Sequence, residues 1–386
     1  MIEADNVLEQ YKGEIIMKKS FALLVALMLT ALLSLSALAE NQTIDILDKI
    51  ELMATSDETI DPALGQSVVE MIEENPQPVA VALLSKLGSD STSDNQLAVY
   101  VWALGLAKSQ TAVKPIQDVY RQSSSDLVKS NCLYALAVIG GKPAEDFLLA
   151  ELQGSEDGEA RFDLMNLLGQ MQCEAVLPFT EEILEKDPNQ YYWQSILVFG
   201  KMGDPATSFL IEHINSENRN VRANAINVLG HWLIAPEATS HLLERYWVED
   251  DRELRGIILS SLEKNILDLS RMKSVFEEIT EKEKDEQLLI FAHETLDNMA
   301  TMKAAVADFA GKKITSADAF LSAYTVLLDS EGEEGSYEAM GIYSTENDEP
   351  RLKALRKKIL LRDSDEAFYD YQKINNIIML NRLAGI

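Results

Sequence analysis

The sequence predicts an all-α protein, an α-solenoid of about seven stacked helix pairs (an α-α superhelix) with helical caps at both ends. Two observations predict it. A motif of apolar residues that ends in a small residue recurs at intervals of 32, 32, 31, 30, 33 and 34 residues, and a fixed period of this length is typical of stacked helical repeats. The 386 residues include only 18 Gly and 10 Pro, which favours long helices over many turns.

The N-terminal segment has the order of a secretory signal peptide. The basic group Met17-Lys18-Lys19 precedes an uncharged stretch, residues 21–39, that ends in Ala37-Leu38-Ala39. Small residues at those two outer positions are typical of a cleavage site. We therefore expect residues 17–39 to be a signal peptide and the mature chain to begin at Glu40.

This interpretation also sets the expected location of the protein. Residues 1–16 carry four acidic side chains and one Lys, the wrong charge for a signal peptide, so we interpret them as an upstream mis-start. We expect an exported protein, periplasmic or secreted, most naturally in a bacterial envelope. The alternative is an uncleaved anchor, because an apolar run of this length can just span a bilayer.

Residues 40–77 form an expected N-terminal helical cap. The residues from Ile44 to Met53 and from Pro62 to Asn75 have amphipathic patterns, and Asp61 is placed to cap the second helix, with Pro62 in its first turn. A solenoid needs such a cap because its terminal repeat would otherwise expose an apolar face.

The repeat itself is defined by one small or polar residue in each copy, here called the anchor. An apolar residue directly precedes every anchor, and another lies four residues before most of them, so at helical spacing both columns share one face. Each copy therefore predicts two helices, A and then B, with the anchor near the end of helix B. The anchors of repeats 1 to 7 are Gly105, Ala137, Gly169, Gly200, Gly230, Glu263 and Asp297.

One copy carries a family resemblance. The segment VRANAINVLG, Val221 to Gly230, resembles helix B of the short bacterial HEAT-like repeats, the PBS-lyase type included. The resemblance covers about residues 78–311 and departs from the pattern at Glu263 and Asp297, where the glycine is missing. It implies an armadillo-like α-solenoid and a scaffold or protein-binding role rather than one chemistry.

A basic column lies eight residues before the anchor in four of the seven copies. Acidic or Asn residues occur in the nearby turns, at Asp126, Asp157, Asn220 and Asp251. We interpret the column as a structural ladder of charges between neighbouring repeats, in preference to a ligand site. The ladder residues are Lys129, Arg161, Arg222 and Arg255.

Helix B also predicts a surface. Positions six and three before the anchor point away from the apolar columns, and we expect them to line the concave side and to bind a protein partner. Packing of Trp102 and Tyr134 on the N-terminal cap is an equal alternative. The predicted partner-binding residues are Trp102, Asn131, Tyr134, Asp163, Asn166, Gln194, Asn224 and Asn227.

Residues 312–386 form an expected C-terminal helical cap with an acidic loop. Residues 329–349 carry eight acidic and no basic side chains, whereas Arg351 to Arg362 carries six basic ones. The opposed charges indicate that the basic stretch lies against the acidic loop or against the acidic solenoid. The loop fails the calcium-binding EF-hand pattern at Glu334 and Met340, which leaves weak divalent-cation binding as an alternative.

Charge and cysteine content exclude several classes of protein. The net charge of -29 disfavours binding to nucleic acid or to anionic lipid, so we expect neither, and no stable membrane span once the signal is cleaved. Cys132 and Cys173 lie too far apart in repeat register for a disulfide. We expect two free, structural cysteines.

Catalytic motifs are mostly absent, and we predict a non-enzymatic scaffold without cofactor or metal. The chain has four histidines and a single His-Glu pair, His293-Glu294, too few for the metal site of HEAT-like hydroxylases. His293 falls in an apolar column, so we interpret it as a core or partly buried residue. The alternative function is that of an enzyme-maturation or lyase-like protein that presents a substrate. The partner is an unknown protein, and nothing in the sequence indicates an oligomeric state.

Overall fold

A computed structural model describes residues 43–55, 62–87, 92–188, 194–233, 235–266 and 268–310, together with Leu352, Ile374 and Ile378. Every regular element in these ranges is a helix, and neighbouring helices stack in sequence order, so the chain has the predicted α-solenoid fold. The expected signal peptide and the expected acidic loop fall outside the described residues. The chain forms two compact units, Met1–Phe147 and Leu148–Ile386.

Unit 1 begins with a helix over residues 43–55, close to the predicted one. The second cap helix also matches its prediction, although its expected cap, Asp61, lies outside the described residues. Ser93 and Gln96 form a capping box at the start of α4, which fixes where helix B of repeat 1 begins. The remaining elements are α2 Pro62–Glu74, α3 Pro76–Lys86, α4 Asp94–Leu106, η1 Gln110–Ala112, α5 Val113–Gln122, α6 Asp126–Ile139 and the first part of α7 Lys142–Gly154.

The first helix of unit 1 is tied to helix B of repeat 1 through one carboxylate. Glu51 accepts hydrogen bonds from the Tyr100 hydroxyl at 2.5 Å, from Lys86 Nζ at 2.9 Å and from Gln96 Nε2 at 2.7 Å. Charge-assisted hydrogen bonds are stronger than neutral ones. The cap is therefore held by polar contacts in addition to its buried apolar residues, Ile46 and Ile50.

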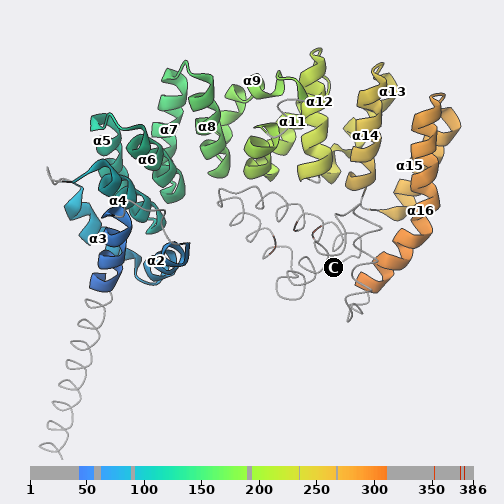
Figure 1. The fold of residues 1–386 in the computed structure, drawn as a ribbon. Helices are drawn as coiled ribbons and strands as arrows, with labels where there is room; N and C mark the ends of the chain where they lie inside the picture. Colours follow the sequence, from blue (N-terminus) through green and yellow to red (C-terminus); the bar gives the residue numbers. More distant parts are fainter. Residues whose placement is uncertain are drawn as a thin grey trace, which may run out of the picture. The chain divides into compact units, whose positions relative to one another are not determined.

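Unit 2 continues the same alternation of A and B helices (Figure 1). Asp157, Asn218 and Asp251 accept backbone N–H groups at the start of the B helices of repeats 3, 5 and 6. The elements are α8 Gly158–Gln170, η2 Glu174–Phe179, α9 Glu181–Leu184, η3 Ile196–Gly200, η4 Asp204–Ala206, α11 Thr207–His213, α12 Arg219–Asn227, η5 Val228–Leu233, η6 Pro236–Ala238, α13 Thr239–Val248, α14 Arg252–Asn265, α15 Leu269–Lys282 and α16 Glu286–Ala310.

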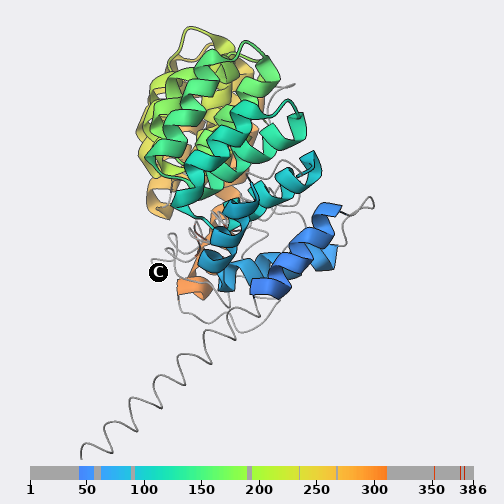
Figure 2. The ribbon, with the colours of Figure 1, turned by 90° about the vertical axis from the view of Figure 1, so that its left-hand side faces the viewer.

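The B helices of unit 2 pack on one another in order, α8 on η3, η3 on η5, α12 on α14 and α14 on α16. Figure 2 shows the green and yellow helices of this unit lying one behind another. Two B helices end in π-helical segments, η3 and η5, where the repeat pattern predicts regular α-helix. A π segment carries one extra residue per hydrogen-bonded turn, so it shifts the side chains that follow it.

The anchor column packs against the next helix B, and its glycines have a steric reason. A Cβ atom on Gly169 would lie 2.7 Å from the carbonyl oxygen of Val198, and one on Gly230 would lie 2.7 Å from Cα of Ser261. Val198 and Ser261 each lie two residues before the next anchor. At Gly169 and Gly230 the small anchor residue is thus a point of close approach to the next helix B.

Candidate interaction surface

The predicted surface residues of unit 1 are half-buried. Trp102, Asn131 and Tyr134 all have intermediate exposure. The Asn131 amide nitrogen donates to the carbonyl oxygen of Leu127, one turn earlier in α6, at 2.9 Å. Its amide group is therefore partly used within its own helix.

In unit 2 four of the five predicted residues are at least partly exposed on the B helices. Asp163 is exposed, and Asn166, Gln194 and Asn227 are half-buried. Leu197, Ile257 and Ser260 occupy the same register and have intermediate exposure. The helix-B face of unit 2 is defined here as these positions: Asp163, Asn166, Gln194, Leu197, Asn227, Ile257 and Ser260.

Asn224 does not belong to this face, and its prediction as a partner-binding residue was wrong. It is 1% exposed, and its amide nitrogen donates to the carbonyl oxygens of Leu184 at 2.8 Å and Lys186 at 3.0 Å. Asn220, one turn earlier, donates to Glu185 O at 3.1 Å. Helix α9 is short, so its final carbonyl groups lack partners within the helix, and α12 supplies them.

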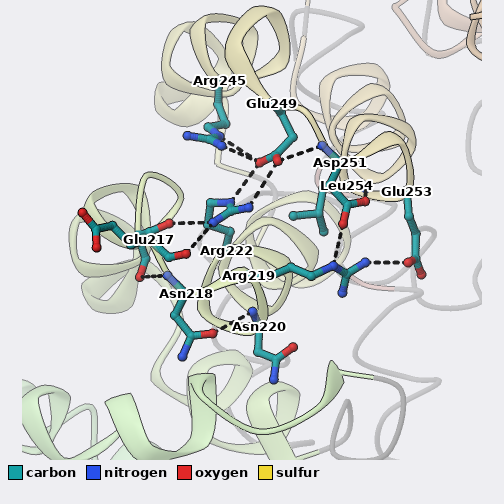
Figure 3. Close-up of polar contacts among 11 residues, drawn as sticks. Glu217, Asn218, Arg219, Asn220, Arg222, Arg245, Glu249, Asp251, Glu253 and Leu254 are labelled. Carbon is teal, nitrogen blue, oxygen red and sulfur yellow. Dashed lines mark hydrogen bonds and ion pairs between the residues drawn. The ribbon is translucent and has the colours of Figure 1, made fainter.

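The basic column of helix B makes contacts between repeats (Figure 3). Arg222 of repeat 5 donates to both carboxylate oxygens of Glu249 of repeat 6, with Nε–Oε2 at 2.9 Å and Nη2–Oε1 at 3.2 Å. Its Nη1 also donates to the carbonyl oxygens of Ser216 at 2.9 Å and Glu217 at 3.0 Å. One guanidinium therefore closes the A–B turn of its own repeat and binds the next repeat.

Glu249 is the centre of this contact. Its side chain is 2% exposed and also accepts Nη2 of Arg245 at 2.7 Å and the backbone N–H of Asp251 at 3.1 Å. Burial alone would raise the pKa of Glu249, but the hydrogen bonds from Arg222, the Asp251 N–H and Arg245 outweigh it, so the pKa lies below the usual value. The carboxylate is held in its ionised form.

A second set of contacts runs beside the first. Arg219 Nε lies 2.6 Å from Oδ2 of Asp251, and Arg219 Nη2 lies 2.5 Å from Glu253. The other oxygen of Asp251 accepts the Leu254 N–H at 3.1 Å and so caps α14. The hydrogen bond from Arg219 lowers the pKa of Asp251. Helix capping and repeat-to-repeat contact thus share one carboxylate.

Both sets recur at the following junction, between repeats 6 and 7. Arg255 pairs with Glu283, which also accepts the Tyr246 hydroxyl and the backbone N–H groups of Lys284 and Asp285. Arg252 Nε lies 3.0 Å from Asp285, which caps α16. The arginines repeat at 33 residues and the carboxylates at 34. We call these paired contacts the double ladder.

Of the other two predicted ladder residues, Arg161 makes a related contact with the next repeat, whereas Lys129 lies over an aromatic ring of its own repeat. Arg161 Nε lies 3.0 Å from Glu182 of the next repeat, and its Nη1 donates to the carbonyl oxygens of Leu152 and Ser155. Lys129 Nζ lies 5.7 Å from the centre of the Tyr120 ring. The sequence predicted the basic residues of the ladder, but it predicted their acceptors among the residues of the nearest turns. For Arg222 and Arg255 the acceptor is a Glu that follows the next helix A. The sequence contains a pattern that could have revealed it, because Glu249-x-Asp251 recurs as Glu283-x-Asp285.

The histidines and cysteines are the remaining residues with the chemistry of metal ligands. In the part of the chain that the structure describes, no three His, Cys, Asp or Glu side chains are grouped to hold a metal ion. His293 is exposed, so its interpretation as a core or partly buried residue was wrong. Cys132 and Cys173 are both buried and neither forms a disulfide, as predicted.

A family model described as HEAT repeats matches residues 177–263, which lie within unit 2 and include α12 and the Arg222–Glu249 contact. That part of the chain is similar to HEAT repeats. HEAT repeats generally serve as scaffolds for protein interactions. A search of curated proteins found no match. Among the described residues, no helix is both long and apolar enough to cross a membrane.

The two helix layers of unit 2 differ in chemistry. On the A helices, α13 exposes His241, Glu244 and Trp247, and α15 exposes Lys273 and Glu277 among others. The helix-B face carries amides, a hydroxyl and apolar side chains, with Asp163 as its charged member. The helix-B face is therefore less charged than the exposed sides of α13 and α15.

Proposed function

We propose that the chain is an exported, non-enzymatic scaffold that binds a protein partner on the helix-B face of its HEAT-repeat unit. The observation that carries this proposal is the low charge of that face in a protein of net charge -29. Amides, hydroxyls and apolar groups contact a partner without the cost of removing charges from water. The order of basic, apolar and small residues before Glu40 supports export.

The double ladder fits this role. It joins successive repeats through buried, ionised contacts such as Arg222–Glu249. The side chains of the helix-B face are therefore already held in place before a partner binds. Preorganised surfaces lose less conformational entropy on binding. A rigid series of B helices is thus suited to a partner that contacts several repeats at once.

Site-specific photo-crosslinking in the envelope of the producing cell tests the proposal. A photoreactive residue is placed at Gln194, Asn227 or Ser260 on the helix-B face, and at Glu244 or Ser274 on the A helices as matched controls. We expect one shared protein adduct from the three B positions and none from the controls. Adducts of equal yield from both layers, or from the A helices alone, would refute the assignment of the face.

Export is tested separately by the intact mass of the protein recovered from the envelope. Cleavage after Ala39 gives a chain that begins at Glu40. A mass that includes residues 17–39 would show that the segment is retained and would contradict the cleavage proposal.

A further inference from the structure

His213 is a half-buried histidine at the end of the A helix of repeat 5. It is the last residue of α11, and its side chain is 17% exposed. Its Nδ1 lies 2.7 Å from the carbonyl oxygen of Phe209, one turn earlier. Because a carbonyl oxygen only accepts hydrogen bonds, Nδ1 must donate, which assigns the ring proton to this nitrogen. The other nitrogen, Nε2, is therefore an acceptor in the neutral ring.

Nε2 of His213 faces a second acceptor on the preceding repeat. It lies 3.4 Å from Oε1 of Glu181, on the A helix α9 of repeat 4. Within the described ranges Glu181 makes no other ion pair or side-chain hydrogen bond. An ionised carboxylate also only accepts, and a water that donated to both atoms would hold them about 4–5 Å apart. The pair therefore needs a cation between its two atoms, either a proton on Nε2 or a metal ion.

The distance between the two atoms separates these cations. A charge-assisted N–H···O⁻ hydrogen bond spans about 2.7–2.9 Å, which is shorter than the 3.4 Å between Nε2 and Oε1. Zn²⁺ binds a histidine nitrogen at about 2.0–2.1 Å and a carboxylate oxygen at about 2.0–2.2 Å. Two such ligand atoms at a tetrahedral angle lie about 3.3–3.5 Å apart. The separation fits a shared metal ion better than a shared proton.

The surroundings of the imidazole support the same reading. The ring of Phe209 lies against the ring of His213, with centroids 4.1 Å apart, so that packing and the Nδ1 hydrogen bond together fix the direction of Nε2. A ring N–H that donates to a backbone carbonyl is the usual support of a metal-binding histidine. The Glu181 side chain is 59% exposed, so an ion can reach the pair from solvent.

We propose that Nε2 of His213 and the carboxylate of Glu181 bind one Zn²⁺ ion or a divalent transition metal of similar chemistry. An imidazole ligand selects such metals over Ca²⁺ and Mg²⁺, which prefer oxygen ligands. Two protein ligands leave about two of the four tetrahedral positions to water or to a ligand from another molecule. The ion joins the A helices of repeats 4 and 5. The site does not depend on the proposed function of the helix-B face.

Isothermal titration calorimetry of the chelator-treated full chain with Zn²⁺ tests the site, in an excess of Mg²⁺ that occupies acidic surface groups. We expect a saturable Zn²⁺ site that is lost in His213→Ala and in Glu181→Gln. The matched controls are His241→Ala and Glu185→Gln, at an exposed histidine and an exposed carboxylate, and both should retain it. Absence of the site in the unmodified chain, or its survival in either His213→Ala or Glu181→Gln, would overturn the proposal.

Histidine-selective ¹⁵N NMR at neutral pH distinguishes a metal from a proton without any substitution. In the chelated protein the ring of His213 should be protonated at Nδ1 and not at Nε2, and Zn²⁺ should shift the Nε2 resonance. The ring of His241 serves as the internal control and should not respond. A His213 ring that is protonated at both nitrogens before and after Zn²⁺ is added would show that a proton occupies the site and would refute the proposal.

Metal binding should also stabilise the junction between repeats 4 and 5, because an ion that binds the folded site favours the folded state. Zn²⁺ should slow amide hydrogen exchange in α9 and α11, and it should not do so in Glu181→Gln. Circular dichroism of the variant should match that of the unmodified chain, which separates loss of the ligand from loss of the fold. Exchange that slows equally in Glu181→Gln would refute the bridge between the two helices.

Discussion

The Arg222–Glu249 contact allows the energetic role of the double ladder to be predicted from its geometry. Arg222 makes four hydrogen bonds, two to the carboxylate and two to turn carbonyls. Removing one partner of a buried ion pair costs about 3–5 kcal/mol. Glu249 keeps Arg245 and the Asp251 N–H, so Arg222→Ala should cost less, about 2–3 kcal/mol. Glu249→Ala leaves two guanidinium groups without their carboxylate and should cost about 3–5 kcal/mol.

Urea denaturation of the mature chain followed by circular dichroism measures the loss, and hydrogen exchange locates it. Exchange should accelerate in α12 and α13 before it does so in unit 1, because repeat proteins lose stability at the affected junction first. Arg271→Ala, an exposed arginine of α15, is the matched control and should leave both readouts unchanged. The reasoning fails if Arg222→Ala destabilises the protein no more than Arg271→Ala, or if the double variant Arg222→Ala, Glu249→Ala shows simple additivity.

Three further outcomes follow from the described contacts. The pKa of Glu249 is below its usual value of 4.5, so its stabilising contribution is complete above about pH 4.5 and is lost as pH falls through the folded-state pKa; acid titration of stability should be shallower in Glu249→Gln. Gly230→Ala places a methyl group against the backbone of Ser261 and should cost about 1–3 kcal/mol by urea denaturation, whereas equal stability would contradict the close-approach argument. Burial raises the pKa of the Cys132 thiol to about 12, so a thiol reagent should not modify Cys132 in the native protein; Cys173 is also buried, and the reagent should reach both thiols only after unfolding.

Much of the fold follows from the sequence because one period carries several independent constraints. The anchor at Gly230 marks a backbone contact, and the apolar residue before it, Leu229, is fully buried. Each constraint is local to helix B, so spacing alone locates it. The same spacing does not reveal the π-helical segments η3 and η5, because an extra residue in one turn depends on how neighbouring helices pack.

The candidate site was harder to predict, and Asn224 shows why. Its position on helix B is equivalent to that of Gln194 and Asp163, so periodicity assigns all three to one face. The shortness of α9 decides the orientation instead, because the carbonyl groups at Leu184 and Lys186 need donors. These carbonyl groups belong to a segment some forty residues earlier in the chain, so the residue pattern of helix B alone does not reveal that Asn224 binds them.

The double ladder and the amide contacts divide unit 2 into junctions of different character. Between repeats 5 and 6, and between 6 and 7, buried carboxylates accept arginine side chains from the preceding repeat. Between repeats 4 and 5 the direction is reversed, and neutral amides of Asn220 and Asn224 donate to backbone carbonyls. Ionised contacts depend on pH and salt, whereas amide contacts do not. As pH falls, the junctions among the last three repeats should therefore loosen first, while the junction between α9 and α12 stays intact. The opposite order of loosening is expected if the neutral contacts are the weaker ones.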